Sequence, residues 1–307
     1  MALTTIAILP YRSPKPYIRL VPKEAKKMTV CIAAITKEKY IVTASDRMVS
    51  GEISSDNCMT KSEQFHEDWS ALISGDLASY APILQRAKIL LAQQENTLAN
   101  ASASLLRAFK EQLAQNAGDR VLGRFGMTMQ DFLTKGKKQF RLEEHMSLWQ
   151  EINAERLNCD FLAFGFDRDK TPHIFRVCEP GILEVYDKLG FWAIGSGEIA
   201  AKTMLYYYGQ NVDARLPESL YRVITAKFMA ERAPGVGKDT SLYVSKHGCF
   251  AFSQPYMLLH EIRASWEEKG KPQPSPDIIP KLEADCKTRI SFFRHTEEGV
   301  VVEKALE

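Results

Sequence analysis

The sequence predicts an α+β fold, a four-layer α/β/β/α sandwich in which two β-sheets lie between two layers of helices. The first observation behind this prediction is the order of the elements, which runs strands, two helices, strands, two helices, strands. The second is that several strands are apolar at both alternating positions, a pattern typical of strands covered on both faces. Helices outside two such sheets would provide that cover.

The first strands are apolar runs rich in β-branched residues, over residues 29–36, 40–45 and 69–74. A short charged connection, 37–39, joins the first two, which predicts a hairpin ending at Asp46. Gly75 stops the third run, and a helix is expected directly after it.

The remaining elements follow from the same periodicities. Helical spacing is expected over residues 77–94, 101–115, 198–208, 217–232 and 256–269, and mostly helical structure over 127–149. Strands are expected over residues 160–166, 173–178, 183–186, 191–194, 241–244 and 249–252.

Three regions are predicted along the chain. Residues 1–28 contain four prolines and six basic side chains against one acidic one, which predicts a leader, a propeptide or an extension from an incorrectly placed start codon. Residues 29–255 are the predicted catalytic domain, with a helical insertion at about 118–156. Residues 256–307 are expected to form a C-terminal helix and a polar tail.

Composition excludes several classes of protein. The 40 basic and 38 acidic residues nearly cancel to a net charge of +2, so neither nucleic acid nor an anionic membrane is an expected partner. No apolar run approaches the length of a membrane span. The six cysteines are scattered and form no CxxC pair, which predicts reduced, mostly buried thiols in a cytoplasmic protein and no metal site.

Thr29 is the candidate nucleophile. The hydroxyl of an N-terminal threonine can attack a carbonyl while its own α-amino group, which titrates near neutral pH, acts as the base. This chemistry requires that nothing precede the threonine. Met28 directly before Thr29 is favourable, because threonine is small enough to follow a removable initiator methionine.

From Thr29 to about Phe252 the chain resembles a proteasome β-type subunit, an N-terminal-nucleophile (Ntn) hydrolase, and most resembles the bacterial single-type members. The order and spacing of several short features carry the resemblance: Thr29 before a strand, Ala44-Ser45-Asp46 closing the hairpin, Lys61 fifteen residues later, Ser74-Gly75 before a helix, Gly195-Ser196-Gly197 before the next helix, and the strand at 241–244.

The resemblance implies a role for each of five residues. Thr29 would be the nucleophile, Lys61 would favour loss of its hydroxyl proton, and Asp46 would pair with Lys61. The N–H of Gly75 would face the developing oxyanion. Ser196 would hydrogen-bond near the free amine and help to move its proton.

The chain departs from the family pattern in three places. The 17-residue interval from Thr29 to Asp46 is one residue longer than in the family, and a longer turn at 37–39 would absorb it. The family also carries a late aspartate and serine that support the amine, and residues 232–236 supply neither. Residues 118–156 and the chain beyond Pro255 exceed a minimal subunit and are expected to serve in assembly or as gates over a chamber.

The function implied is a threonine-type endopeptidase that acts through an acyl-enzyme, with no cofactor and no metal. By resemblance its substrates would be polypeptides, and it would work in a self-compartmentalising homo-oligomer, a ring or open ring, with an ATPase unfoldase as a further partner. Two other interpretations stay open. One is a non-catalytic, proteasome-like structural subunit that keeps residues 1–28, and the other is an Ntn hydrolase of small amides.

Overall fold

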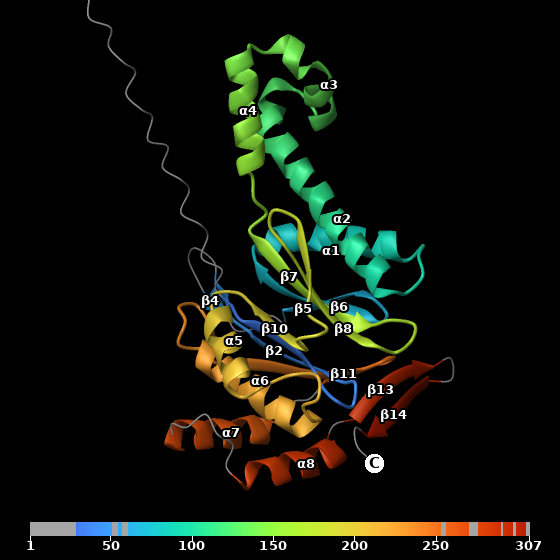
Figure 1. Ribbon diagram of the computed structural model, residues 1–307, viewed down its shortest axis with the longest axis vertical. Coiled ribbons are helices and arrows are strands. Elements are labelled where there is room, and N and C mark those ends of the chain that lie inside the picture. The colour runs from blue at the N-terminus through green and yellow to red at the C-terminus, as the bar shows by residue number, and fades with distance from the viewer. Residues whose placement is uncertain are drawn as a thin grey trace, which may run out of the picture.

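Two antiparallel sheets form the centre of the computed structural model, which describes residues 29–50, 55–56, 61–252, 256–269, 276–289, 291–296 and 299–304 (Figure 1). The predicted leader, 1–28, lies outside the described residues. The larger sheet has the strand order β10-β1-β2-β11-β12-β13-β14. Its strands are β1 (Cys31–Ile35), β2 (Ile41–Asp46), β10 (Phe191–Ile194), β11 (Thr240–Lys246), β12 (Cys249–Phe252), β13 (Ser291–Thr296) and β14 (Gly299–Lys304).

The second sheet has the order β5-β6-β7-β8-β9, so each strand pairs with its neighbour in the chain. Its strands are β5 (Ser62–His66), β6 (Trp69–Gly75), β7 (Cys159–Phe166), β8 (Pro172–Cys178) and β9 (Ile182–Val185). Two further short strands, β3 (Val49–Ser50) and β4 (Ser55–Asp56), pair with each other.

The two sheets pack against each other through a shared apolar cluster. Cys31, Ala33 and Ile35 of β1 and Ile194 of β10 contribute from the larger sheet, and Leu72 of β6 from the smaller one, joined by side chains of β2, β7 and β8. All members of this cluster are almost fully buried. The opposite parity of β1, represented by Val30, Ile32 and Ala34, enters a second cluster with the helices. This two-sided burial explains why the strand lacks the polar alternation of a half-exposed strand.

Helices cover the outer face of each sheet. The smaller sheet packs against α1 (Leu77–Leu91) and α2 (Leu98–Ala117), and the larger one against α5 (Glu198–Tyr207) and α6 (Leu216–Ala230). The mixture of helices and antiparallel sheets confirms the predicted α+β class. Figure 1 shows the two pairs of helices on opposite sides of the sheets.

Two more helices pack outside α6, where Figure 1 shows them at the lower edge of the molecule. They are α7 (Tyr256–Lys269) and α8 (Ile278–Arg289). Ile262 of α7 and Ile278 and Leu282 of α8 are buried in the same cluster as the core of α6. The C-terminal region is therefore packed on the helical layer of the larger sheet and extends that sheet with β13 and β14.

The insertion predicted at about 118–156 is helical and projects away from the sheets (Figure 1). After a π-helical turn (Gly118–Leu122) and a 3-10 turn (Gly123–Phe125), it contains α3 (Met129–Gln139) and α4 (Leu142–Ala154). Phe132 is fully buried at the centre of a separate small core and contacts the rings of Phe140, His145 and Trp149. The stretch predicted as mostly helical, 127–149, is thus two helices separated at Phe140–Arg141, and residues of both pack around Phe132.

In the region predicted as a polar tail, the described residues beyond 269 form α8, β13 and β14, which the periodicities of the sequence do not predict. The edge strand β5 was not predicted because only Phe65 in it is fully buried and its other side chains are polar. Of the helices in the described ranges, none combines the length and apolar character needed to cross a bilayer.

Candidate active site

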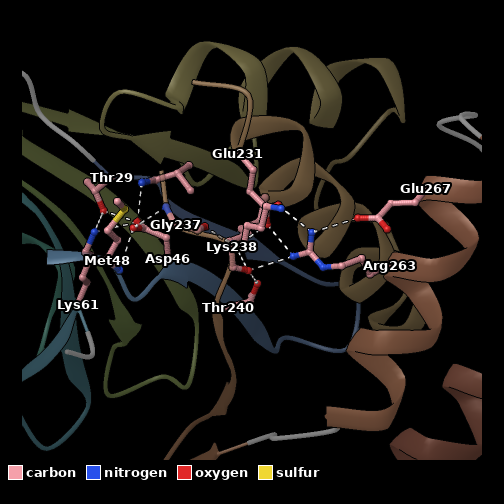
Figure 2. A network of polar contacts seen from close by, with 12 residues as sticks. Thr29, Asp46, Met48, Lys61, Glu231, Gly237, Lys238, Thr240, Arg263 and Glu267 are labelled. Atoms are coloured by element: carbon pink, nitrogen blue, oxygen red, sulfur yellow. Dashed lines mark hydrogen bonds and ion pairs between the residues drawn. The ribbon is translucent and has the colours of Figure 1, made fainter. Parts of the chain in front are cut away.

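Thr29 lies immediately before β1 and is almost fully buried. Its carbonyl oxygen accepts a hydrogen bond from the N–H of Gly197, 3.2 Å away. Gly197 follows β10, the strand beside β1. The side-chain hydroxyl points toward the ends of β2 and β5, where Asp46 and Lys61 stand (Figure 2). The start of β1 therefore places one hydroxyl between an acidic and a basic side chain.

The Asp46 carboxylate is the centre of the site. It is fully buried at the end of β2, and its Oδ1 accepts from the Thr29 hydroxyl at 2.5 Å and from the N–H of Val30 at 2.9 Å. Its Oδ2 accepts from the N–H groups of Met48 at 3.1 Å and Gly237 at 3.3 Å. A buried carboxylate needs several hydrogen-bond donors of this kind, because an ionised group without donors is costly to bury.

The turn of the first hairpin sets this geometry. In the register of β1 and β2, Cys31 faces Ser45 and Ile35 faces Ile41, and the intervening turn contains Lys39 in the left-handed region, with φ of 63°. The pairing of β1 with β2 runs from Cys31 to Ile35 without a shift in register. The side chain of Asp46 consequently faces Thr29.

Lys61 completes the contact on the other sheet. Its Nζ donates to the Thr29 hydroxyl oxygen and, at 2.8 Å, to Asp46 Oδ1. The side chain is almost fully buried, and the carbonyl of Lys61 accepts from the N–H of Ile73 at 2.9 Å, which fixes its backbone on β6. The hydroxyl therefore accepts from an ammonium group while it donates to a carboxylate, and the two contacts hold it in one orientation. The positive charge of Lys61 favours loss of the hydroxyl proton.

Cys31 is a second nucleophilic side chain near this group. Its Sγ donates to the carbonyl of Ile73 at 3.5 Å. Burial raises the pKa of Cys31 to about 12, although the Lys61 cation acts in the opposite direction. A thiol that stays protonated is a poor nucleophile, so the environment favours the Thr29 hydroxyl. The other described cysteines, Cys159, Cys178 and Cys249, are also buried.

Ser196 lies at the backbone of Thr29. The Thr29 N–H donates to Ser196 Oγ at 3.2 Å, and that hydroxyl lies 3.3 Å from the carbonyl of Thr29 and 3.2 Å from the carbonyl of Pro234. Removal of residues 1–28 would convert this nitrogen into a free amine beside the serine. The structure thus brings Thr29, Asp46, Lys61 and Ser196 into one hydrogen-bonded group.

The glycines beside Ser196 are required by close approach. A Cβ on Gly195, whose φ is 100°, would lie 2.3 Å from the carbonyl oxygen of Thr29. A Cβ on Gly197 would lie 2.8 Å from the Cβ of Ala230 on α6. The turn therefore allows the backbone of Thr29 to sit against it, which a residue with a side chain would prevent.

Gly75 is placed by backbone geometry at the end of β6. Its φ is 110°, and a Cβ there would lie 1.9 Å from the carbonyl oxygen of Asn158. Ile73, two residues earlier, accepts from Cys31, so this end of β6 lies beside the start of β1. Gly75 is thus at the same end of the two sheets as Thr29. The oxyanion contact expected of Gly75 would use its main-chain N–H and needs no side chain.

Sequence reasoning missed the loop after α6. Residues 232–236 carry neither the aspartate nor the serine of the family pattern, but main-chain groups of this loop contact the site instead. The carbonyl of Pro234 accepts from Ser196, and the N–H of Gly237 donates to Asp46. Main-chain donors and acceptors occur in every residue type, so the sequence does not reveal which of them contact the site. The glycines at 235 and 237 were the one signal that could have indicated this loop.

No cluster of three or more metal-binding side chains occurs within the ranges that the structure describes. The polar groups of the site are paired with one another instead. What the arrangement offers chemically is an oriented hydroxyl, a buried cation and a nitrogen that becomes an amine if the chain is cut before Thr29.

Comparison with known proteins supports the fold. No family model matches the sequence, and no curated protein matches it. Among solved structures, the chain is similar to a Gly-1 mutant of Anbu from Hyphomicrobium sp. strain MC1, with a TM-score of 0.55. The two share 16% sequence identity, and the match covers 78% of this chain and 94% of that one. At this level of identity the similarity concerns the fold alone.

Proposed function

We propose that this protein is an Ntn hydrolase of the threonine peptidase type, active once Thr29 is the first residue. One observation carries the proposal: the Thr29 hydroxyl donates to the buried carboxylate of Asp46 and accepts from the buried ammonium of Lys61. A threonine on the surface would not be expected to lie between two buried side chains of opposite charge. The pairing and burial are those that activate a weak hydroxyl nucleophile.

The fold that supports this chemistry is, in our proposal, the four-layer α/β/β/α sandwich expected from the sequence. The apolar cluster shared by the two sheets and the helices on their outer faces support it. The similarity to a proteasome-like protein points the same way. The nucleophile then stands at one end of the packed sheets, beside Gly75.

In the first half of the reaction, the free α-amine of Thr29 takes the proton of the hydroxyl while Oγ1 attacks the carbonyl carbon of the substrate. Lys61 stabilises the negative charge on Oγ1, and Asp46 holds Lys61 in place. The N–H of Gly75 stabilises the oxyanion of the tetrahedral intermediate. The C–N bond then breaks, and the departing amine takes the proton from the α-ammonium group, with Ser196 beside it.

In the second half, water attacks the ester carbonyl of the acyl-enzyme. The α-amine accepts a proton from this water, and the same oxyanion contact stabilises the second tetrahedral intermediate. The bond between the acyl carbon and Oγ1 breaks, the proton returns to Oγ1, and the carboxylic acid product leaves. No cofactor or metal enters the proposed sequence.

The substrates we propose are polypeptides, cut inside a homo-oligomer that encloses its active sites as a ring or an open ring. An ATPase unfoldase would deliver them, and the assembly would work in the cytoplasm. The insertion at about 118–156 and the C-terminal helices would then serve in assembly. Substrate class, assembly, ATPase partner and location are thus parts of the proposal beyond the chemistry of the site.

The experiment compares the full chain with a form whose N-terminus is Thr29, released from a fusion by a protease that cuts before this residue. Intact-mass measurement defines the first residue of each preparation. We expect hydrolysis of an N-acylated fluorogenic peptide by the Thr29 form, retention of part of it by Thr29→Ser, and its loss in Thr29→Ala. Thr134→Ala, an exposed threonine of α3, is the matched control and should leave the rate unchanged.

The outcomes separate the alternatives. An active preparation in which every molecule retains residue 1 would contradict a terminal nucleophile. A Thr29 form that is folded but hydrolyses neither peptides nor small amides would indicate a non-catalytic structural subunit. Hydrolysis of small amides alone would indicate the third interpretation, an Ntn hydrolase with a different substrate class.

A further inference from the structure

The loop from residue 234 to 238 contacts the site at two points. The N–H of Gly237 donates to Asp46 Oδ2 at 3.3 Å, and the carbonyl of Pro234 accepts from Ser196 at 3.2 Å. The loop therefore contacts both the residue that pairs with Lys61 and the residue beside the amine of Thr29. Its position determines whether Asp46 keeps one of its main-chain donors.

Lys227 of α6 holds this loop from behind. Its side chain is fully buried, and Nζ donates to the carbonyls of Gly237 at 2.9 Å and Lys238 at 2.6 Å and to the carboxylate of Glu231 at 2.6 Å. An ammonium group has three donors, and all three are used here. Burial lowers the pKa of Lys227 to about 8, while Glu231 acts in the opposite direction, so the ammonium form persists at neutral pH.

Arg263 of α7 contacts Glu231 and the same loop from the outer side. Its guanidinium donates to both carboxylate oxygens of Glu231, at 2.7 and 2.8 Å, and to the carbonyl of Lys238 at 3.0 Å. The guanidinium carbon also lies 4.0 Å from the centre of the Phe228 ring. A two-pronged contact of this kind fixes orientation as well as distance. Figure 2 shows the continuous series of contacts from Thr29 through Asp46 and Gly237 to Arg263.

We propose that Lys227 and Arg263 are positioning residues for the Thr29 site, and that the C-terminal helix α7 thereby supports catalysis. The inference rests on the proposed function, since it assigns these residues to the same reaction. Neither side chain touches Thr29 in the hydrogen bonds described above. They act through the loop carbonyls and Glu231, which keep the Gly237 N–H directed at Asp46.

A purely structural role would require only that the volume of Lys227 be filled. An apolar side chain of similar length would fill it but would leave the carbonyls of Gly237 and Lys238 without this donor. Buried main-chain carbonyls without donors are costly, so the loop would move toward water. Movement of the loop removes the Gly237 N–H from Asp46, and the consequence reaches the nucleophile.

Two variants in the Thr29 form test the inference. Lys227→Met removes all three donors from the inside, and Arg263→Gln removes the two-pronged contact from the half-buried outside, where misfolding is less of a risk. Arg86→Gln is the matched control, because Arg86 joins Glu111 across α1 and α2, with Nε 2.6 Å from the carboxylate, on the helices of the other sheet. All three variants are compared with the wild type at full chain length from Thr29.

Hydrogen exchange of residues 235–239 is the first measurement, and it does not depend on activity. The peptide kinetics are the second. We expect Arg263→Gln and Lys227→Met to speed exchange in this loop and to lower kcat by up to about 100-fold with little change in KM, since a small displacement of a reacting group has this size of effect.

Each outcome decides a separate point. Faster exchange together with lower kcat, and neither change in Arg86→Gln, supports the inference. Unchanged exchange in the loop, or faster exchange with unchanged kcat, overturns it. A wild-type protein without any hydrolytic activity overturns the proposed function, and the exchange measurement then still shows whether Lys227 and Arg263 hold the loop.

Discussion

The Thr29 hydroxyl lies 2.5 Å from Asp46 Oδ1, although the two residues stand 17 positions apart at opposite ends of a hairpin. The register of β1 and β2 brings them together, since Cys31 faces Ser45 and the two ends of the hairpin meet. A shift of the register by one residue would turn the Asp46 side chain to the other face of the sheet. The contact is therefore a sensitive indicator of whether the start of the chain is correctly folded.

Lys61→Met should lower peptide hydrolysis by the Thr29 form roughly 10²- to 10⁴-fold, the range typical of losing a group that assists proton transfer. Removing one partner of a buried ion pair also costs about 3 kcal/mol of unfolding free energy, because the other charge is left behind. The main-chain donors to Asp46 keep the cost at this lower end. Peptide kinetics and urea unfolding measure the two effects.

Lys135→Met is the control for this substitution. Lys135 pairs with Asp131 on the exposed surface of α3, at 2.8 Å, so its loss should leave both hydrolysis and stability nearly unchanged. If Lys61→Met behaves like Lys135→Met, the cation beside the hydroxyl has no chemical role.

Gly195→Ala should destabilise the protein by more than about 3 kcal/mol, because strain in the left-handed region adds to a clash with the main chain of Thr29. Gly209→Ala provides the comparison. Gly209 has φ of 66°, but nothing lies within 4 Å of its added Cβ, so about 1–2 kcal/mol is expected. Thermal or urea unfolding of the two variants gives the difference, and equal costs would contradict the close approach at Thr29.

His173 should make stability depend on pH. Its Nδ1 lies 2.6 Å from Asp187 and its Nε2 3.1 Å from Asp167. Burial lowers the pKa of His173, but the hydrogen bonds and charges of the two aspartates raise it by more, so the net direction is upward. A group whose pKa is raised on folding stabilises the protein fully below its unfolded value, near 6.5, and loses that contribution as the pH rises through its folded value.

The measurement is the difference in unfolding free energy between the wild type and His173→Gln across this range. The difference should be largest near pH 5.5 and should decline toward pH 8.5. A difference that grows with pH would show that the neutral imidazole is the form stabilised by folding.

The insertion carries its own small core, so a cavity there should have a local effect. Phe132→Ala removes a fully buried ring that contacts Phe140, His145 and Trp149, at an expected cost of about 3–5 kcal/mol to the folding of the insertion. Faster hydrogen exchange confined to α3 and α4, with unchanged peptide kinetics, is the expected result. Spread of the effect to β7 or α2 would show that the insertion and the sheets unfold together.

The first hairpin and the Gly195–Gly197 turn could be predicted from the sequence for a physical reason. Their apolar strands, charged turn and glycines are local patterns. The candidate site is what the family resemblance implies, carried by the order and spacing of Thr29, Asp46 and Lys61. The edge strand β5 could not be predicted in the same way, since its polar residues resemble a loop. The sequences of β13 and β14 contain β-prone residues, yet the pairing of β13 with β12 joins residues far apart in the chain, Phe250 and Phe293.

The side chains that hold the loop beside Asp46 could not be predicted from such local patterns. Lys227 is a single lysine in an otherwise uncharged stretch of a helix, 223–230, where sequence alone indicates a side chain that extends to solvent. Arg263 lies on another helix 36 positions later. Both side chains donate to the main-chain carbonyl of Lys238 and to the carboxylate of Glu231. A main-chain carbonyl as acceptor cannot be recognised from residue types. Only the folded arrangement of α6, α7 and the loop between them reveals the contact.

Acid-quench mass spectrometry tests the nucleophile most directly. The Thr29 form is mixed with an N-acylated peptide ester, stopped in acid within its first turnovers, digested and mapped. We predict an added acyl mass on the peptide that begins with Thr29, located on the side-chain oxygen, and no such mass in Thr29→Ala. An acyl group on another residue, or steady hydrolysis by Thr29→Ala, would contradict the assignment of Thr29 as the nucleophile.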